Sequence, residues 1–148
     1  MELARYFDLQ LVYFMNSTTK EEALRFLVEK VTRVKDLPDS NRFFDALLER
    51  EKIVSTGIGM AVAIPHAKLA SYADFFIAIG ILQKGIDWNA LDGAPVRIIF
   101  LIGGPDDKQT EYLKILSALT TAIRNESLRK KLLASVSSEE IIEMLESI

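Results

Sequence analysis

The sequence predicts an α/β or α+β fold in which a small sheet packs between helices. Apolar residues recur with helical spacing in the first and last thirds of the chain, whereas the middle holds short apolar runs rich in β-branched residues. Those runs are apolar at nearly every position, which is typical of strands covered on both faces. Because no repeat, linker or low-complexity segment interrupts this order, we expect residues 1–148 to form one layered domain.

Two helices are predicted before the strands. Thr19 and Glu22 fit a capping box, and apolar residues at i, i+3, i+4 and i+7 extend the first helix to about Val34. The segment 37–39 (Leu-Pro-Asp) ends that helix and begins a second one. The apolar face of the second helix holds Phe43, Phe44, Leu47 and Leu48. We expect this helix to end near Arg50-Glu51.

Three strands and three further helices complete the predicted order. Glycine-containing turns separate the strands, which we place at residues 61–64, 75–82 and 96–102. We place the helices at residues 109–124, 126–134 and 138–148. Ser137 caps the last of them, with Glu140 three residues further on.

Composition argues against several classes of function. A net charge of −3 lacks the basic footprint of a nucleic-acid-binding protein. The absence of cysteine removes disulfides, thiolate catalysis and cysteine-ligated zinc, and a single histidine without clustered carboxylates disfavours any metal site. No apolar stretch approaches the roughly 20 residues that span a bilayer. The start of the chain also lacks a signal-peptide pattern, so we expect a cytoplasmic protein without direct membrane insertion.

The only histidine ends the most informative segment, residues 55–66. In a chain without cysteine, an imidazole with an unperturbed pKa of roughly 6.5 is the main neutral nucleophile near pH 7. Pro65 has no backbone donor, which suits a strand end and leaves the side chain of His66 free of the ladder. The alternative is a structural histidine, which is the more common role of a lone residue of this type.

Arg50 is the second candidate residue, because a guanidinium binds phosphate through a planar fork of donors, although the sequence alone does not place it near His66. Its alternative role is to complement the helix dipole from the last turn. The segment 55–59 (Ser-Thr-Gly-Ile-Gly) is either a phosphate cradle or a glycine turn before a strand, and it has neither P-loop nor dinucleotide-binding spacing. No order of serine, histidine and aspartate supports a hydrolase.

Two groups of motifs occur together in the chain. Arg50-Glu51, residues 55–59 and residues 63–66 read R-E…S-T-G-I-G…A-I-P-H, and residues 85–96 read G-x-x-W…D-G-x-P-V. This combination resembles the enzyme IIA domains of the mannitol/fructose and nitrogen-regulatory class in the bacterial phosphoenolpyruvate:sugar phosphotransferase system (PTS EIIA type 2). The resemblance covers nearly the whole chain. It implies a small mixed sheet flanked by helices on both faces.

The resemblance also implies a phosphoryl carrier rather than a multi-turnover enzyme. His66 would accept a phosphoryl group from phospho-HPr, or its nitrogen-branch homologue, and pass it to an EIIB domain or use it as a regulatory signal. Arg50 matches the arginine that supports the phosphoryl group, and Ser55 and Thr56 are expected as secondary donors. Transfer between two imidazoles needs in-line positioning and dispersal of charge, so no cofactor and no metal is expected.

One position departs from the family pattern. Many members carry a second histidine at the start of the helix after the G-x-P loop, and the aligned residue here is Tyr112. A tyrosine hydroxyl donates a hydrogen bond to phosphate but is not a cation near pH 7. Alternatively, Tyr112 belongs to the core. It motivates a second hypothesis, a regulatory protein-binding module on the same fold that is phosphorylated weakly or not at all. The sequence does not separate the sugar branch from the nitrogen-regulatory branch.

Overall fold

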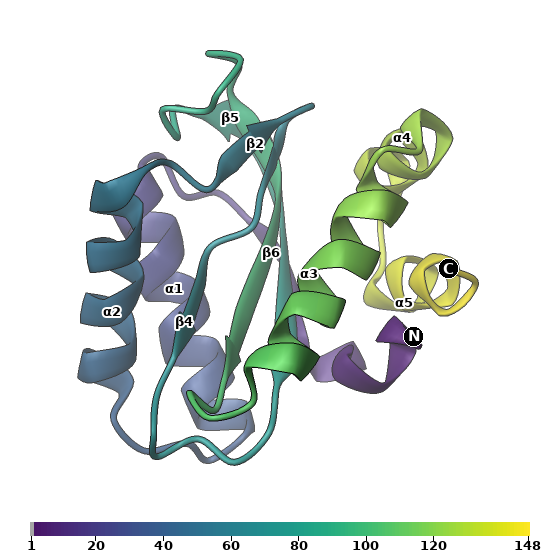
Figure 1. Ribbon diagram of the computed structural model, residues 1–148. Helices are drawn as coiled ribbons and strands as arrows, with labels where there is room; N and C mark the ends of the chain where they lie inside the picture. Colours follow the sequence, from purple (N-terminus) through teal and green to yellow (C-terminus); the bar gives the residue numbers. More distant parts are fainter. Residues whose placement is uncertain (1) are drawn as a thin grey trace.

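The structure of the protein, a computed structural model, describes residues 2–148. A mixed sheet of six strands stands between two layers of helices (Figure 1). One layer consists of α1 (Lys20–Val34) and α2 (Ser40–Ile53). The other consists of α3 (Gln109–Ile123), α4 (Glu126–Ala134) and α5 (Ser138–Glu146), with the 3-10 turns η1 (Leu3–Tyr6) and η2 (Leu9–Leu11) beside them. The predicted fold class is confirmed.

The two longest strands form the centre of the sheet. Its strands are β1 (Val12–Met15), β2 (Gly57–Gly59), β3 (Val62–Ala63), β4 (His66–Lys68), β5 (Phe76–Ile86) and β6 (Val96–Gly104). Their order is β1-β5-β6-β3-β2, and β4 also pairs with β6. β5 and β6 are antiparallel, β1 is parallel to β5, and both β3 and β4 are parallel to β6. β3 and β4 therefore pair with β6 one after the other, separated by a break at residues 64 and 65.

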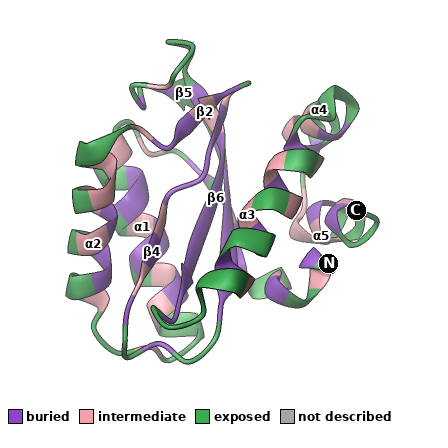
Figure 2. Cartoon of the chain, in the orientation of Figure 1, coloured by how far each residue is buried: buried purple, intermediate pink, exposed green. Residues whose placement is uncertain are grey.

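The central strands bury both of their faces, as Figure 2 shows for β6. Alternate side chains of a strand point to opposite sides of a sheet. In β5, Phe76 and Ala78 belong to the core under α1 and α2, whereas Ile77 and Ile79 belong to the core under α3, α4 and α5. This two-sided burial is the reason that the strand sequences are apolar at nearly every position.

The helix predictions are confirmed with small changes at their ends. α1 and α4 have the predicted bounds, and Thr19 caps α1 by accepting a hydrogen bond from the backbone N–H of Glu22 at 3.1 Å. α2 continues to Ile53, beyond its predicted end. α3 ends at Ile123 and α5 at Glu146, slightly earlier than predicted. None of the helices in the described part of the chain combines the length and apolar character needed to cross a lipid bilayer.

The strand predictions were incomplete. β1 and β4 were not predicted, and Gly57 and Gly59, interpreted as turn residues, belong to β2. β5 continues past Leu82, and Gly103 and Gly104 extend β6 instead of forming a turn. Strands of two to four residues carry too few positions for a period-two pattern. Their existence depends on pairing with β5 and β6, which lie far along the chain.

Candidate functional site

His66 is the first residue of β4, at the point where the chain rejoins the sheet after Pro65. The carbonyl of Pro65 accepts a hydrogen bond from the backbone N–H of Ile102 at 2.9 Å, and His66 lies opposite Ile102 in the parallel register. Pro65 has no backbone N–H to donate, but its carbonyl still joins the chain to β6. The imidazole is partly exposed, so it remains open to a partner.

Two hydrogen bonds define the tautomer of the imidazole. Nδ1 of His66 lies 3.0 Å from the carbonyl oxygen of Ile64, which only accepts, so Nδ1 carries the proton. Nε2 lies 3.1 Å from Nε of Arg50, which only donates, so Nε2 presents its lone pair. The atom beside the guanidinium is thus the nucleophilic nitrogen of the ring.

Arg50 reaches this ring from the last turn of α2. Its Nη1 donates a hydrogen bond to the carbonyl of Val54 at 2.7 Å, while its Nε donates to His66. Two contacts at different nitrogens hold the planar guanidinium in one orientation and leave other N–H groups for an anion. We call Arg50 and His66 the reactive pair. Sequence reasoning selected both residues, and the structure brings them into contact.

Burial is the main factor that lowers the pKa of His66. The hydrogen bond to the Ile64 carbonyl opposes this effect, whereas the positive charge of Arg50 reinforces it. Because the pKa lies below its ordinary value of roughly 6.5, the ring is neutral at physiological pH. A neutral imidazole keeps the Nε2 lone pair that nucleophilic attack requires.

Tyr112 lies beside the reactive pair, in the first turn of α3. Its ring centroid is 5.6 Å from that of His66 and 6.2 Å from that of Phe75. The residue is only 6% exposed, and burial raises the pKa of its hydroxyl to about 12. Tyr112 is therefore both a core residue and a neutral neighbour of the imidazole. Its role as a hydrogen-bond donor to the phosphoryl group stays a prediction.

The hydroxyls of Ser55 and Thr56 are engaged elsewhere. Ser55 donates to the carbonyl of Trp88 at 2.6 Å, and Thr56 donates to the carboxylate of Glu51 while accepting from Nε1 of Trp88 at 3.1 Å. Both residues line a pocket of about 300 Å³ together with His66. Because these hydroxyls already have partners, Arg50 is the donor in direct contact with the imidazole. The predicted secondary roles of Ser55 and Thr56 stay predictions.

Glu51 is a site residue that sequence reasoning did not single out. Its side chain is 5% exposed and accepts from Nζ of Lys20 at 2.9 Å and from the backbone N–H of Thr56 at 3.1 Å. Together with Trp88 these residues form what we call the anchor network: Lys20, Glu51, Thr56 and Trp88. The network ties α1 and α2 to the loop that leads to β2. Apart from its place in the R-E motif, no sequence signal indicated this residue.

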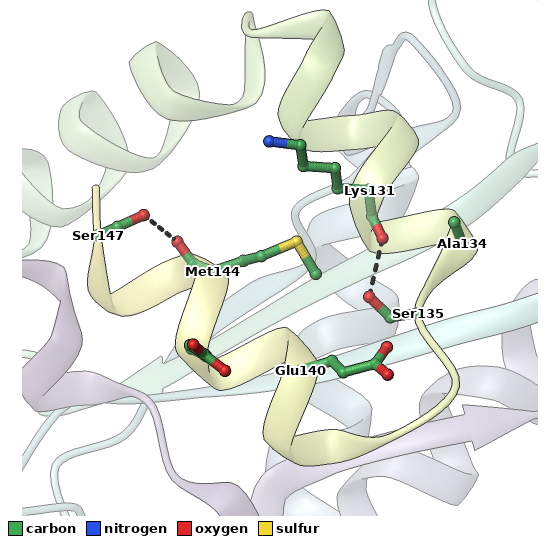
Figure 3. A pocket seen from close by; sticks show the side chains of 7 residues that line it. Lys131, Ala134, Ser135, Glu140, Met144 and Ser147 are labelled. Atoms are coloured by element: carbon green, nitrogen blue, oxygen red, sulfur yellow. Dashed lines mark hydrogen bonds between the residues drawn. The ribbon is translucent and has the colours of Figure 1, made fainter.

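A hollow away from the reactive pair lies between α4 and α5 (Figure 3). It measures about 600 Å³ and is lined by Lys131, Ala134, Ser135, Glu140, Glu143, Met144 and Ser147. Ser135 follows α4 and Ser147 follows α5, and their hydroxyls donate to backbone carbonyls in the last turns of those helices, so they are not free nucleophiles. Across residues 2–148, no three histidine, cysteine or acidic side chains are grouped as metal ligands. The reactive pair is the better candidate site.

Comparison with known sequences gives one consistent match. Residues 5–148 match the family model described as "Phosphoenolpyruvate-dependent sugar phosphotransferase system, EIIA 2". The PTS system fructose-specific EIIABC component of Bacillus subtilis is 36% identical over 131 residues, which are 88% of this chain but 21% of that protein. The nitrogen regulatory protein of Bradyrhizobium diazoefficiens is 33% identical over 127 residues, 86% of this chain and 82% of the relative. The chain thus spans about a fifth of the first relative and most of the second.

Solved structures show the same architecture. The nitrogen regulatory protein IIA-Ntr of Neisseria meningitidis superposes with a TM-score of 0.90 at 28% identity, covering 97% of this chain and 98% of that one. The mannitol enzyme IIA of Escherichia coli, solved in complex with phosphorylated enzyme IIB, superposes with a TM-score of 0.80 at 22% identity. That match covers 96% of this chain and 99% of that one, and it concerns the fold alone.

Proposed function

Because the chain belongs to the EIIA 2 family of the phosphoenolpyruvate-dependent sugar phosphotransferase system, we propose that it carries a phosphoryl group on Nε2 of His66. Family membership makes the chain a phosphotransferase component. The observation that carries the assignment of the atom is the 3.1 Å contact between Nε of Arg50 and an unprotonated Nε2. We further propose that residues 1–148 form one domain of this type.

The reaction follows from the tautomer. The hydrogen bond from Nε of Arg50 to Nε2 first opens, because the nitrogen has a single lone pair. Nε2 then attacks the phosphorus of a phosphohistidine on HPr or on its nitrogen-branch homologue, in line with the bond to the donor imidazole. The new N–P bond forms as the old one breaks, and the donor nitrogen keeps the electron pair. The proton on Nδ1 stays on the bond to the Ile64 carbonyl, so no proton has to leave His66. Arg50 then faces the phosphoryl oxygens, where its N–H groups disperse negative charge.

Two destinations for the phosphoryl group are consistent with the relatives. The 36% identical relative, a PTS system fructose-specific EIIABC component, supports transfer to an EIIB domain. Relatives named nitrogen regulatory protein support a phosphorylation state that acts as a signal to target proteins. An HPr-type donor also implies a cytoplasmic location. A binding module that is not phosphorylated is the less favoured alternative, since it gives no reason for an unprotonated Nε2 beside a fixed guanidinium.

The test is phosphorylation by the complete donor chain. The protein is incubated with phosphoenolpyruvate, enzyme I and HPr, and acid-labile phosphohistidine is located by mass spectrometry. We expect label on His66 in the wild type and none in His66→Ala, with circular dichroism confirming that the variant is folded. Label that persists in His66→Ala, or a wild type that accepts none, overturns the proposal.

A further inference from the structure

Lys68 is a second cation close to the reactive pair. It lies two residues beyond His66 in β4, so both side chains leave the strand on the same side. The charged groups that act on the imidazole are Arg50, Glu51 and Lys68. The carboxylate of Glu51 is already bound by Lys20 and Thr56. Among the residues that the structure describes, Lys68 is thus a cation near His66 that, like Arg50, is not held by a carboxylate.

Neutral groups hold the ammonium of Lys68 in place. Its Nζ lies 4.2 Å from the ring centroid of Tyr112 and donates to Oε1 of Gln109 at 2.6 Å. The same Tyr112 ring is the neighbour of the imidazole, at 5.6 Å between centroids. Within residues 2–148 Lys68 forms no ion pair with an acidic side chain. An ammonium bound by an amide and a ring face is free to exchange those partners for an anion.

Phosphorylation of His66 changes the charge balance of this site. A phosphoryl group brings close to two negative charges at neutral pH. Arg50 supplies one positive charge, and Tyr112 stays neutral because burial raises the pKa of its hydroxyl to about 12. The proton kept on Nδ1 gives the phosphorylated ring a positive charge of its own, but that N–H faces the Ile64 carbonyl and not the phosphoryl oxygens. Arg50 is so far the one cation that donates to those oxygens, and a second cation beside them would stabilise their charge. The lysine stem has four carbons and rotates freely enough to bring its ammonium across the Tyr112 ring.

The geometry points to Lys68 as the second phosphoryl-binding cation of this chain: its ammonium exchanges Gln109 for the phosphoryl oxygens on His66. The inference rests on the proposed function. Lys68 binds the product of the transfer and not the neutral imidazole. Its removal therefore lowers the equilibrium constant for accepting the phosphoryl group.

The experiment compares four proteins: wild type, Lys68→Met, Lys68→Arg and Lys114→Met. Lys114 is an exposed residue of α3, and its substitution changes the net charge equally. Each protein is mixed with HPr, enzyme I and phosphoenolpyruvate, and the ratio of phosphorylated chain to phospho-HPr is measured at equilibrium. We expect about a tenfold lower transfer constant in Lys68→Met, the size of one charge-assisted hydrogen bond. Lys68→Arg and Lys114→Met should stay within about twofold of wild type.

Two outcomes overturn the inference: an unchanged constant in Lys68→Met, or an equal loss in Lys114→Met, which would assign the effect to net charge. A wild type that HPr leaves unlabelled is instead a failure of the proposed function. Lys68 is then tested on protein phosphorylated at His66 with phosphoramidate, whose P–N bond breaks as ammonia leaves. In a phosphorus-NMR titration, the pKa of the phosphoryl group should be higher in Lys68→Met than in wild type. Equal values would overturn the inference on this route too.

Discussion

Arg50 and Glu51 are consecutive residues of α2, yet their side chains serve two different regions. Arg50 belongs to the reactive pair, where the imidazole is partly exposed and Nε2 is unprotonated. Glu51 belongs to the anchor network, where a 5% exposed carboxylate is bound by Lys20 and Thr56. Successive residues of a helix point in directions about 100° apart, so one helix end supports both regions. We expect changes in the anchor network to cost stability and changes in the reactive pair to cost transfer.

The largest effect is predicted for Glu51→Ala. The change leaves Lys20 without its ion-pair partner, and it leaves the backbone N–H and the hydroxyl of Thr56 without their acceptor. We expect the loss to cost about 3 kcal/mol of unfolding free energy. Denaturant unfolding measures it. Glu49→Ala is the matched control, because Glu49 and its partner Lys52 are both 72% exposed, and it should cost under about 0.5 kcal/mol. Equal losses of unfolding free energy in Glu51→Ala and Glu49→Ala would contradict the stabilising role of the anchor network.

Arg50→Ala tests the other side of the comparison. Loss of the guanidinium at the transferred group should slow phosphoryl acceptance by HPr about 100-fold, as for loss of an oxyanion donor. The unfolding free energy should change by less than about 1 kcal/mol, because both partners of Arg50 stay partly accessible to water. Rapid-quench kinetics and denaturant unfolding give the two numbers. Lys52→Ala is the control, because it removes a positive charge from the same end of α2. If Arg50→Ala and Lys52→Ala accept the phosphoryl group at equal rates, Arg50 has no role in the transfer step.

Tyr112→Phe separates the ring of Tyr112 from its hydroxyl. The ring packs on His66 and Phe75, whereas the hydroxyl donates no hydrogen bond to another residue in the described range 2–148. Stability should therefore change by less than about 0.5 kcal/mol. If the hydroxyl binds the phosphoryl group, the rate of acceptance should fall roughly fivefold, about 1 kcal/mol. An unchanged rate would assign Tyr112 to the core alone.

The smallest effect is expected in the dependence of stability on pH. The folded pKa of His66 is lowered, mainly by burial, so the unfolded chain takes up a proton at this residue first. The contribution of His66 to stability is thus complete above roughly pH 6.5 and is lost as the pH falls from there through the lowered folded pKa. Unfolding experiments between pH 8 and 5 should show this loss in wild type but not in His66→Gln. Parallel curves for the two proteins would contradict it.

Local signals explain what could be predicted from the sequence. The cap at Thr19 and the bounds of α1 and α4 depend on residues a few positions apart, and these predictions are confirmed. β1 and β4 depend on pairing with β5 and β6 across the chain, which no local pattern encodes. Fold class was predictable because burial on both faces makes the central strands apolar at nearly every position.

In the candidate site, too, the residues were predictable from local sequence, whereas their contacts were not. His66 stood out as the only histidine, placed after a proline, and Arg50 through the family motif. Their contact joins the end of α2 to the start of β4, which only the folded chain brings together. The hydroxyls of Ser55 and Thr56 were expected beside the phosphoryl group. Their bonds to Trp88, more than thirty residues away, were not visible in the local sequence.

The bond from Nδ1–H to the Ile64 carbonyl is the feature on which the account depends most. The most direct measurement is nitrogen-15 NMR of the phosphorylated protein with labelled histidine, which identifies the ring nitrogen bonded to phosphorus. The account predicts phosphorylation at Nε2, with the proton retained on Nδ1. A phosphorus bonded to Nδ1 would contradict it, because that nitrogen is occupied by the Ile64 carbonyl in this structure.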